Sequence, residues 1–293
     1  MFVASVKNRL TTFVDGIAVD VEEASNGRFG SDIAQIYPVW DDFAEWGRTH
    51  NARGAGDVPD DLLSAPSPQP SQVFAISLNY LDHAKEANLE IPDFPSVFTK
   101  FPSCIVGPNV DVQLAEPTTD WEIELVLVIG RTAHRVSPTH GWDYVAGITV
   151  GQDLSDRTRQ LSGMPYPQFS LGKSYPGYGP TGPWLVTPDE LANRSDVALR
   201  CTVDGEVVQQ FRSSTMIFTV PELVAHLSSI VELRPGDLIF TGTSSGVGFA
   251  RSPKRFLSPG QRIVSEIEGV GTLRTQLVFT TATSAADGDN VVS

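Results

Sequence analysis

A pair of glutamates at the entrance to an apolar run constrains this chain more than any other feature. Glu122 and Glu124 stand two positions apart, and the residues that follow, 125–129, are all Leu, Val or Ile. Such a run predicts a buried β-strand. Because side chains alternate along a strand, both carboxylates should point to one face and Ile123 to the other. Two like charges at a buried strand repel each other and resist desolvation, so the pattern predicts a cation between them.

A third carboxylate follows another apolar run. Residues 145–150 predict a second strand, and Asp153 comes shortly after it. Three carboxylates with room for water suit Mg²⁺ or Mn²⁺, with Ca²⁺ as an alternative, whereas zinc prefers His and Cys ligands. The competing interpretation is that Glu122 and Glu124 are exposed at a strand start and that Asp153 caps a helix beginning at 155.

Short apolar runs recur along the chain between Gly and Pro residues, whereas helical patterns are few. This alternation argues against a doubly wound parallel sheet and predicts a mixed β, β-rich α+β fold. Gly, Pro and Ser are frequent in 51–71, which indicates a linker, and three prolines in 90–103 predict a loop. We expect a small N-terminal α+β domain over 1–66, a catalytic domain over 67–280 and a flexible tail over 281–293. Strands are expected at 2–5, 10–14, 17–21, 73–78, 124–129, 145–150, 183–187, 197–203, 237–241, 262–267 and 272–279, and helices at 38–50, 79–89, 155–161, 188–193 and 221–230.

The bulk composition limits the classes of function. A formal net charge of -14 over 293 residues argues against nucleic acid and anionic membranes as partners. The two cysteines, Cys104 and Cys201, provide neither a disulfide framework nor a thiolate metal site. No apolar run approaches the ~18 residues of a membrane span, and the N-terminus lacks the apolar core of a signal peptide. We expect a cytoplasmic protein that acts on a small molecule.

A candidate general base lies upstream of the glutamates. His83 and Glu86 are three residues apart in a predicted helix, so the carboxylate can orient the imidazole and raise its basicity. An ordinary helical histidine with a salt-bridge neighbour would show the same spacing. The remaining histidines show no partner spacing that indicates chemistry: His50, His134, His140 and His226.

Two glycine-containing loops supply further candidates. Lys173 follows a glycine and can bring its ammonium to a substrate carboxylate or a developing oxyanion, although a solvated loop lysine is the alternative. Residues 241–248 form a glycine-rich loop after an expected strand and resemble a nest of backbone N–H groups that binds anions. A plain turn is the alternative there. The loop lacks the Gly-Lys-Ser/Thr of a Walker motif.

Segments spread over the chain from about residue 70 onward resemble the fumarylacetoacetate hydrolase family in their order. They are NYLDHAKE (79–86), PSVFTKFPS (95–103), DWEIELVLVIGR (120–131), DYVAGITVGQDLSDRTRQ (143–160), LGKSY (171–175), GPTGPWLVT (179–187), RPGDLIFTGTSSGVG (234–248) and FLSPGQRI (256–263). The chain resembles the bacterial members that carry a small N-terminal domain. The resemblance implies a mixed β-sandwich roll, a homodimer, and a metal-dependent enzyme that hydrolyses a C–C bond in a 2,4-dioxo acid.

The resemblance also implies residue roles. It assigns metal ligation to Glu122, Glu124 and Asp153, catalysis to His83, Glu86 and Lys173, and substrate contact to Lys100, Gln160 and Thr243. Met164 stands where the namesake hydrolase has a substrate-contacting tyrosine, and Ser244 replaces the usual proline of its loop, so another 2,4-dioxo acid is expected. Oxaloacetate decarboxylation and isomerisation of a 2-hydroxy-dienoate fit the same residues. A non-catalytic metal- or ligand-binding module is the alternative from another class.

Overall fold

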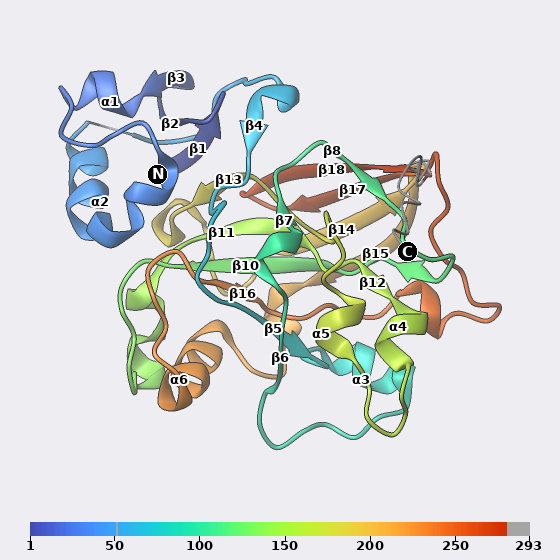
Figure 1. Cartoon of the computed structure of the whole chain (residues 1–293). Coiled ribbons are helices and arrows are strands. Elements are labelled where there is room, and N and C mark those ends of the chain that lie inside the picture. Colours follow the sequence, from blue (N-terminus) through green and yellow to red (C-terminus); the bar gives the residue numbers. More distant parts are fainter. Residues whose placement is uncertain (51, 280–293) are drawn as a thin grey trace, which may run out of the picture.

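A computed structural model describes residues 1–50 and 52–279, and the tail predicted over 281–293 lies outside them. Within the described residues, the larger of two main β-sheets has 11 strands and the smaller has 5 (Figure 1). Helices are few and short, as the sequence predicts. They are α1 (Val21–Ala24), α2 (Trp40–Thr49), α3 (Leu81–Ala87), α4 (Arg157–Leu161), α5 (Phe169–Gly172) and α6 (Val220–Ile230), with 3₁₀ turns at Ile33–Gln35, Tyr37–Val39, Asp60–Leu62, Pro102–Cys104, Pro138–Tyr144, Pro188–Glu190, Ser213–Thr215 and Gly248–Ala250.

The larger sheet runs through the whole molecule. Across its width lie β3 (Ile17–Asp20), β2 (Arg9–Val14), β1 (Phe2–Val6), β13 (Gly179–Val186), β11 (Val145–Gln152), β10 (Ile123–Ile129), β16 (Leu238–Phe240), β5 (Val73–Ser77) and β6 (Ser96–Thr99), with β4 (Leu63–Ser64) beside β1 and β7 (Ile105–Val106) beside β13. The smaller sheet contains β15 (Glu206–Arg212), β14 (Ala198–Val203), β17 (Arg262–Ile267), β18 (Gly271–Val278) and β8 (Val110–Gln113), and a short separate pair is formed by β9 (Thr119–Asp120) and β12 (Ser155–Asp156).

The central strand β10 is buried on both faces. Leu125 and Leu127 point into the core shared with the smaller sheet, while Val126 and Val128 pack into a second core with the N-terminal unit. A strand covered on both sides needs apolar residues at every position, which is why this run shows no polar alternation. The mixed β fold predicted from the sequence is confirmed.

Some of the predicted elements differ from the structure. The expected loop over 90–103 contains the edge strand β6, and the expected linker over 51–71 contains β4. The predicted helix over 155–161 begins as the short strand β12, and only a 3₁₀ turn forms within 188–193. Strand β15 was not predicted, because its sequence EVVQQFR mixes polar and apolar residues without a clear period. The division into domains at residue 66 stays a prediction, since β1 pairs with β13 across it.

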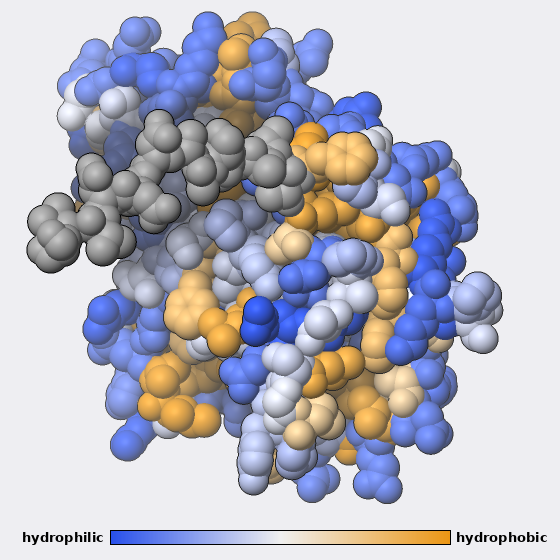
Figure 2. Space-filling model, turned by 45° about the vertical axis from the view of Figure 1, so that its right-hand side comes forward, coloured by the Kyte–Doolittle hydropathy of each residue, from blue (hydrophilic) through white to orange (hydrophobic). Residues whose placement is uncertain are grey.

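The surface is largely hydrophilic, and hydrophobic patches interrupt it in Figure 2. Apolar side chains of the segment between α3 and β6 are exposed, among them Leu89, Ile91 and Phe94. No helix in the described part of the chain is long and apolar enough to cross a membrane. The homodimer stays a prediction.

Candidate active site

Antiparallel pairing of β10 and β11 brings the three predicted metal carboxylates together. The register places Glu124 opposite Gly151, so the start of β10 lies beside the end of β11. The backbone N–H of Asp153 donates to the carbonyl of Glu122 at 2.9 Å and continues this pairing. One carboxylate oxygen from each of Glu122, Glu124 and Asp153 lies within 4.8 Å of the others. The strand pairing therefore gathers the acidic cluster that the sequence pattern indicated.

All three carboxylates are buried, and their electrostatic surroundings differ. Although burial opposes ionisation, the positive charges of Lys173 and Arg157 hold the pKa of Glu122 below its usual range. Glu124 has no cationic side chain within ion-pair distance among residues 1–50 and 52–279. Burial, together with the negative charges of Asp153 and Glu122, raises the pKa of Glu124 well above its usual range. A further cation beside Glu124 would remove this repulsion.

The chemistry of this donor set fits a hard divalent cation. Carboxylate oxygens are the ligands that Mg²⁺, Mn²⁺ and Ca²⁺ prefer, and the described residues place no His or Cys ligand in the cluster. The carboxylate of Glu124 is buried beside two other carboxylates, so such an ion would stabilise its ionised form. Glu122, Glu124 and Asp153 would hold it. We call these three residues the carboxylate cluster.

Charged side chains alternate in sign through the floor of the site. The order is Asp120, Arg157, Glu122, Lys173, Asp153 and Lys100, and successive members approach each other to 2.6–2.7 Å. Each of the four inner members lies between two opposite charges, which lowers the cost of burying it. Arg157 was missed from the sequence. It lies one helical turn before the predicted Gln160 and donates to its side-chain oxygen at 2.9 Å, so this i,i+3 spacing was the available signal.

Lys173 reaches the carboxylate cluster because Gly172 lets α5 pack tightly on α4. A Cβ at Gly172 would lie 2.6 Å from the backbone nitrogen of Gln160. The Lys173 ammonium is 2.7 Å from an oxygen of Glu122 and 2.7 Å from an oxygen of Asp153. Burial disfavours its charge, but these two carboxylates outweigh burial and raise the pKa of Lys173. The loop lysine is therefore buried among anions and not solvated.

The predicted histidine dyad lies at the other side of the site, on α3. His83 Nδ1 is 3.2 Å from Glu86 Oε2, and both side chains are about one-fifth exposed. The second oxygen of Glu86 accepts a hydrogen bond from the backbone N–H of Gly246 at 2.9 Å. Because both oxygens of Glu86 are bound, the carboxylate is fixed and orients the ring. The Nε2 atom of His83 is left to exchange a proton.

The glycine-rich loop after β16 binds anions that belong to the protein itself. The backbone N–H of Gly242 donates to Glu124 at 2.7 Å, and that of Gly246 donates to Glu86. Further along, the N–H groups of Gly248 and Phe249 donate to the carboxylate of Asp120. The nest predicted at 241–248 therefore connects the dyad, the carboxylate cluster and the row of charges.

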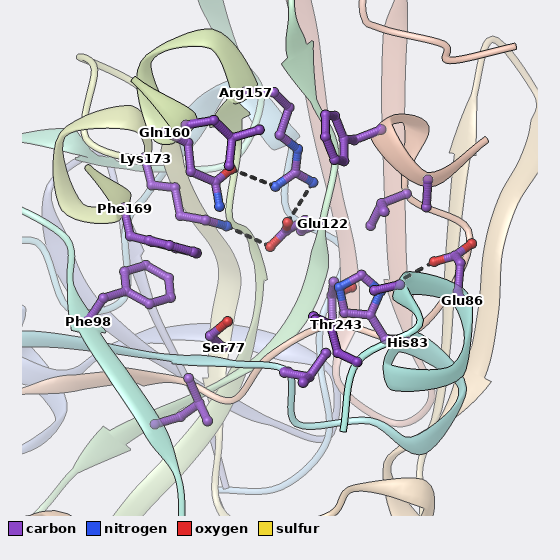
Figure 3. Close-up of a pocket in the computed structure, with 18 residues that line it drawn as sticks. Ser77, His83, Glu86, Phe98, Glu122, Arg157, Gln160, Phe169, Lys173 and Thr243 are labelled. Atoms are coloured by element: carbon purple, nitrogen blue, oxygen red, sulfur yellow. Dashed lines mark hydrogen bonds and ion pairs between the residues drawn. The ribbon is translucent and has the colours of Figure 1, made fainter. Parts of the chain in front are cut away.

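A cavity of about 400 Å³ separates the dyad from the buried charges (Figure 3). Six of the nine predicted site residues line this cavity: His83, Glu86, Glu122, Gln160, Lys173 and Thr243. Glu124 and Asp153 lie deeper, and apolar side chains form much of the remaining wall. Thr243 also donates its hydroxyl to the carbonyl of Ile123, which fixes it against β10.

Lys100 does not line the cavity, so its predicted contact with substrate is not supported by its position. Its side chain is 0% exposed, and its amine forms an ion pair with Asp153 outside the cavity lining. The sequence could not show this, because a lysine after an edge strand is expected in solvent.

Several known proteins resemble this chain in sequence and in fold. Residues 72–278 match the family model described as fumarylacetoacetate (FAA) hydrolase C-terminal. The human protein "Oxaloacetate tautomerase FAHD2A, mitochondrial" is 40% identical over 218 residues, which cover 73% of this chain and 68% of that protein. The crystal structure of a "putative HpcE protein" from Mycobacterium smegmatis has a TM-score of 0.89 and 47% identity, over 96% of this chain and 100% of that chain. Maleylpyruvate hydrolase from Sphingobium sp. SYK-6, solved with manganese(II) and pyruvate, matches with a TM-score of 0.75 over 95% of this chain and 99% of that chain, and its 24% identity shows a likeness of fold.

Proposed function

Because this chain belongs to the fumarylacetoacetate hydrolase family, we propose that it is a divalent-metal-dependent enzyme that hydrolyses a C–C bond of a 2,4-dioxo acid. The substrate would be an acylpyruvate, and the products would be pyruvate, or a substituted 2-oxo acid, and a carboxylic acid. Glu122, Glu124 and Asp153 would bind Mg²⁺ or Mn²⁺. Such an ion supplies Lewis-acid polarisation and stabilises negative charge that develops on a 2-oxo acid.

One observation supports this function best: a fixed base and a set of buried cations line the same cavity from opposite sides (Figure 3). His83, oriented by Glu86, would take a proton from water, and the resulting hydroxide would attack the distal carbonyl carbon. The bond between that carbon and C3 then breaks, and its electron pair stays on C3 as an enolate. The proton from water is finally returned to C3. The ammonium of Lys173 would oppose the negative charge of the enolate.

The cavity wall indicates the kind of acyl group. Large apolar side chains line it beyond the charged groups, among them Leu89, Phe98, Leu161, Phe169 and Phe249. Burial of apolar surface favours an apolar acyl group over a second carboxylate. We therefore expect acylpyruvates with a larger apolar acyl group to be better substrates than acetylpyruvate.

Oxaloacetate tautomerisation is a second candidate. The human relative at 40% identity carries that activity in its name. Tautomerisation moves a proton between C3 and the C2 oxygen, and a base placed like His83 can carry that proton without activating water. The apolar wall is the observation against it, because oxaloacetate is small and carries two carboxylates.

A substrate panel tests the proposal. Acetylpyruvate, a longer-chain acylpyruvate, fumarylpyruvate and oxaloacetate would each be assayed with Mg²⁺ or Mn²⁺, and again after removal of the metal with EDTA. We expect hydrolysis of the acylpyruvates, faster for the longer chain, that disappears with EDTA and returns with Mn²⁺. Acceleration of the keto–enol exchange of oxaloacetate alone would favour the second candidate. Mn²⁺ binding without any turnover would indicate a non-catalytic binding module.

A further inference from the structure

Lys100 is a fully buried lysine whose three ammonium hydrogens all have acceptors. Its Nζ atom donates to Asp153 Oδ1 at 2.6 Å, to the carbonyl of Tyr178 at 3.2 Å and to the carbonyl of Lys173. The backbone N–H of Lys100 donates to the carbonyl of Val73 at 3.0 Å, so β5 also fixes its main chain. An ammonium group has three donors around one nitrogen, and this arrangement uses all of them.

Two of the three acceptors of Lys100 belong to residues of the proposed site, Asp153 and Lys173. Asp153 uses Oδ1 for Lys100, which leaves Oδ2 to accept from the Lys173 ammonium at 2.7 Å. The carbonyl of Lys173 is bound by the same amine, so the backbone from which the Lys173 side chain extends is also held. One ammonium therefore sets the position of a proposed metal ligand and of a proposed catalytic lysine.

We propose that Lys100 is a positioning residue for the metal site and not a substrate ligand. Its ammonium pairs with Asp153 at 2.6 Å, and its three hydrogen bonds fix Asp153 and the backbone of Lys173 in place. Groups that orient metal ligands typically change metal affinity by about 10–100-fold when they are removed. The inference rests on the proposed metal site, and it makes no use of the hydrolytic step.

The first test is Lys100→Met, which removes the ammonium and keeps an apolar stem of similar length beside Phe240. Mn²⁺ affinity would be measured by calorimetry on protein shown to be folded by circular dichroism. We expect Mn²⁺ binding to weaken by about 10–100-fold. Lys85→Met is the matched control, because Lys85 is exposed and paired with Asp82, and it should leave Mn²⁺ affinity unchanged.

The second test does not require a stable variant. Surface lysines of the unmodified protein would be acetylated and located by mass spectrometry, with and without Mn²⁺ and acetylpyruvate. We expect Lys100 to remain unlabelled in every condition and Lys85 to be labelled. If Lys100 is labelled and acetylpyruvate suppresses this labelling, the proposal is overturned, because the amine would then contact the substrate.

The outcomes separate this role from the proposed function. If the wild-type protein binds no Mn²⁺, the proposed function itself fails. If the wild type binds Mn²⁺ and folded Lys100→Met binds it equally well, only the role of Lys100 is wrong. A raised KM for acetylpyruvate in Lys100→Met with unchanged Mn²⁺ affinity would equally overturn it.

Discussion

Two histidines in this chain bind a carboxylate three residues further on, and their surroundings give them different functions. His83 pairs with Glu86 at 3.2 Å and lines the cavity. His140 pairs with Asp143 at 3.0 Å, and both of these side chains are more than half exposed. At the scale of single residues, the pair itself is therefore common, and its position beside the cavity and the buried charges gives it chemical meaning.

This contrast provides a matched test of the base. His83→Ala should lower kcat for acylpyruvate hydrolysis by about 10²–10⁴-fold, because general-base catalysis contributes that much. Mn²⁺ affinity should stay near the wild-type value, since His83 is not in the carboxylate cluster. His140→Ala removes an equivalent pair and should leave kcat unchanged. Steady-state kinetics and calorimetry on both variants would check this, and near-normal turnover in His83→Ala would exclude the dyad as the base.

Sequence patterns predicted the residues whose spacing reflects a local period. The strand period placed Glu122 and Glu124 on one face, and the helical period paired His83 with Glu86. The same helical period was overlooked at His140, where the structure shows a pair. Lys100 could not be placed in this way, because its acceptors come from segments 53 to 78 positions away. Long-range contacts of this kind carry no local signal.

At the scale of elements, the loop after β16 connects the two sides of the site. Gly246 has a φ of +101°, and a Cβ there would lie 2.3 Å from the carbonyl oxygen of Val208. The tight backbone conformation directs the N–H of Gly246 at Glu86 and lets its carbonyl accept from the indole of Trp121 at 3.1 Å. Glycine is required there because both the conformation and the space exclude a side chain.

Gly246→Ala should therefore lower kcat by more than its loss of folding stability explains. A strained left-handed residue costs about 1–3 kcal/mol, and displacement of the loop would remove the N–H that fixes Glu86. Gly260→Ala is the control, since Gly260 has a φ of +90° with nothing within 4 Å of the added carbon. Denaturation and kinetics would be compared at a temperature where both variants are folded. Equal kcat values for the two variants would contradict the proposed role of the loop.

Prediction of elements from sequence succeeded where burial was uniform. The apolar runs of β10 and β11 predicted their strands, because both strands are buried at every position. The edge strand β6 was predicted as loop because of the prolines in 90–103, and its side chains are mostly exposed in the structure. An edge strand needs only one partner, and proline is tolerated beside it. The order of the strands in the sheets could not be derived, since most neighbours are distant in sequence.

At the scale of the whole molecule, the N-terminal unit and the rest of the chain share a hydrophobic core. Phe43 and Trp46 of α2 belong to the same buried cluster as Val126 of β10 and Phe240 of β16. The other face of β10 packs against the smaller sheet through Leu125. The sheet that carries the carboxylate cluster is thus covered on one side by residues outside the segment 72–278 that matches the family model.

This shared core predicts that the chain unfolds as one cooperative unit. Phe43→Ala, at a fully buried position, should destabilise the protein by about 3–5 kcal/mol and lower the midpoint of a single transition. Leu273→Ala, buried in the core between the two sheets, should destabilise the protein by about 2–5 kcal/mol and lower the midpoint of the same transition. Urea unfolding followed by tryptophan fluorescence and by far-ultraviolet circular dichroism would test this. Two separate transitions, with Phe43→Ala moving one and Leu273→Ala the other, would mean that residues 1–66 fold independently and that the shared core contributes little.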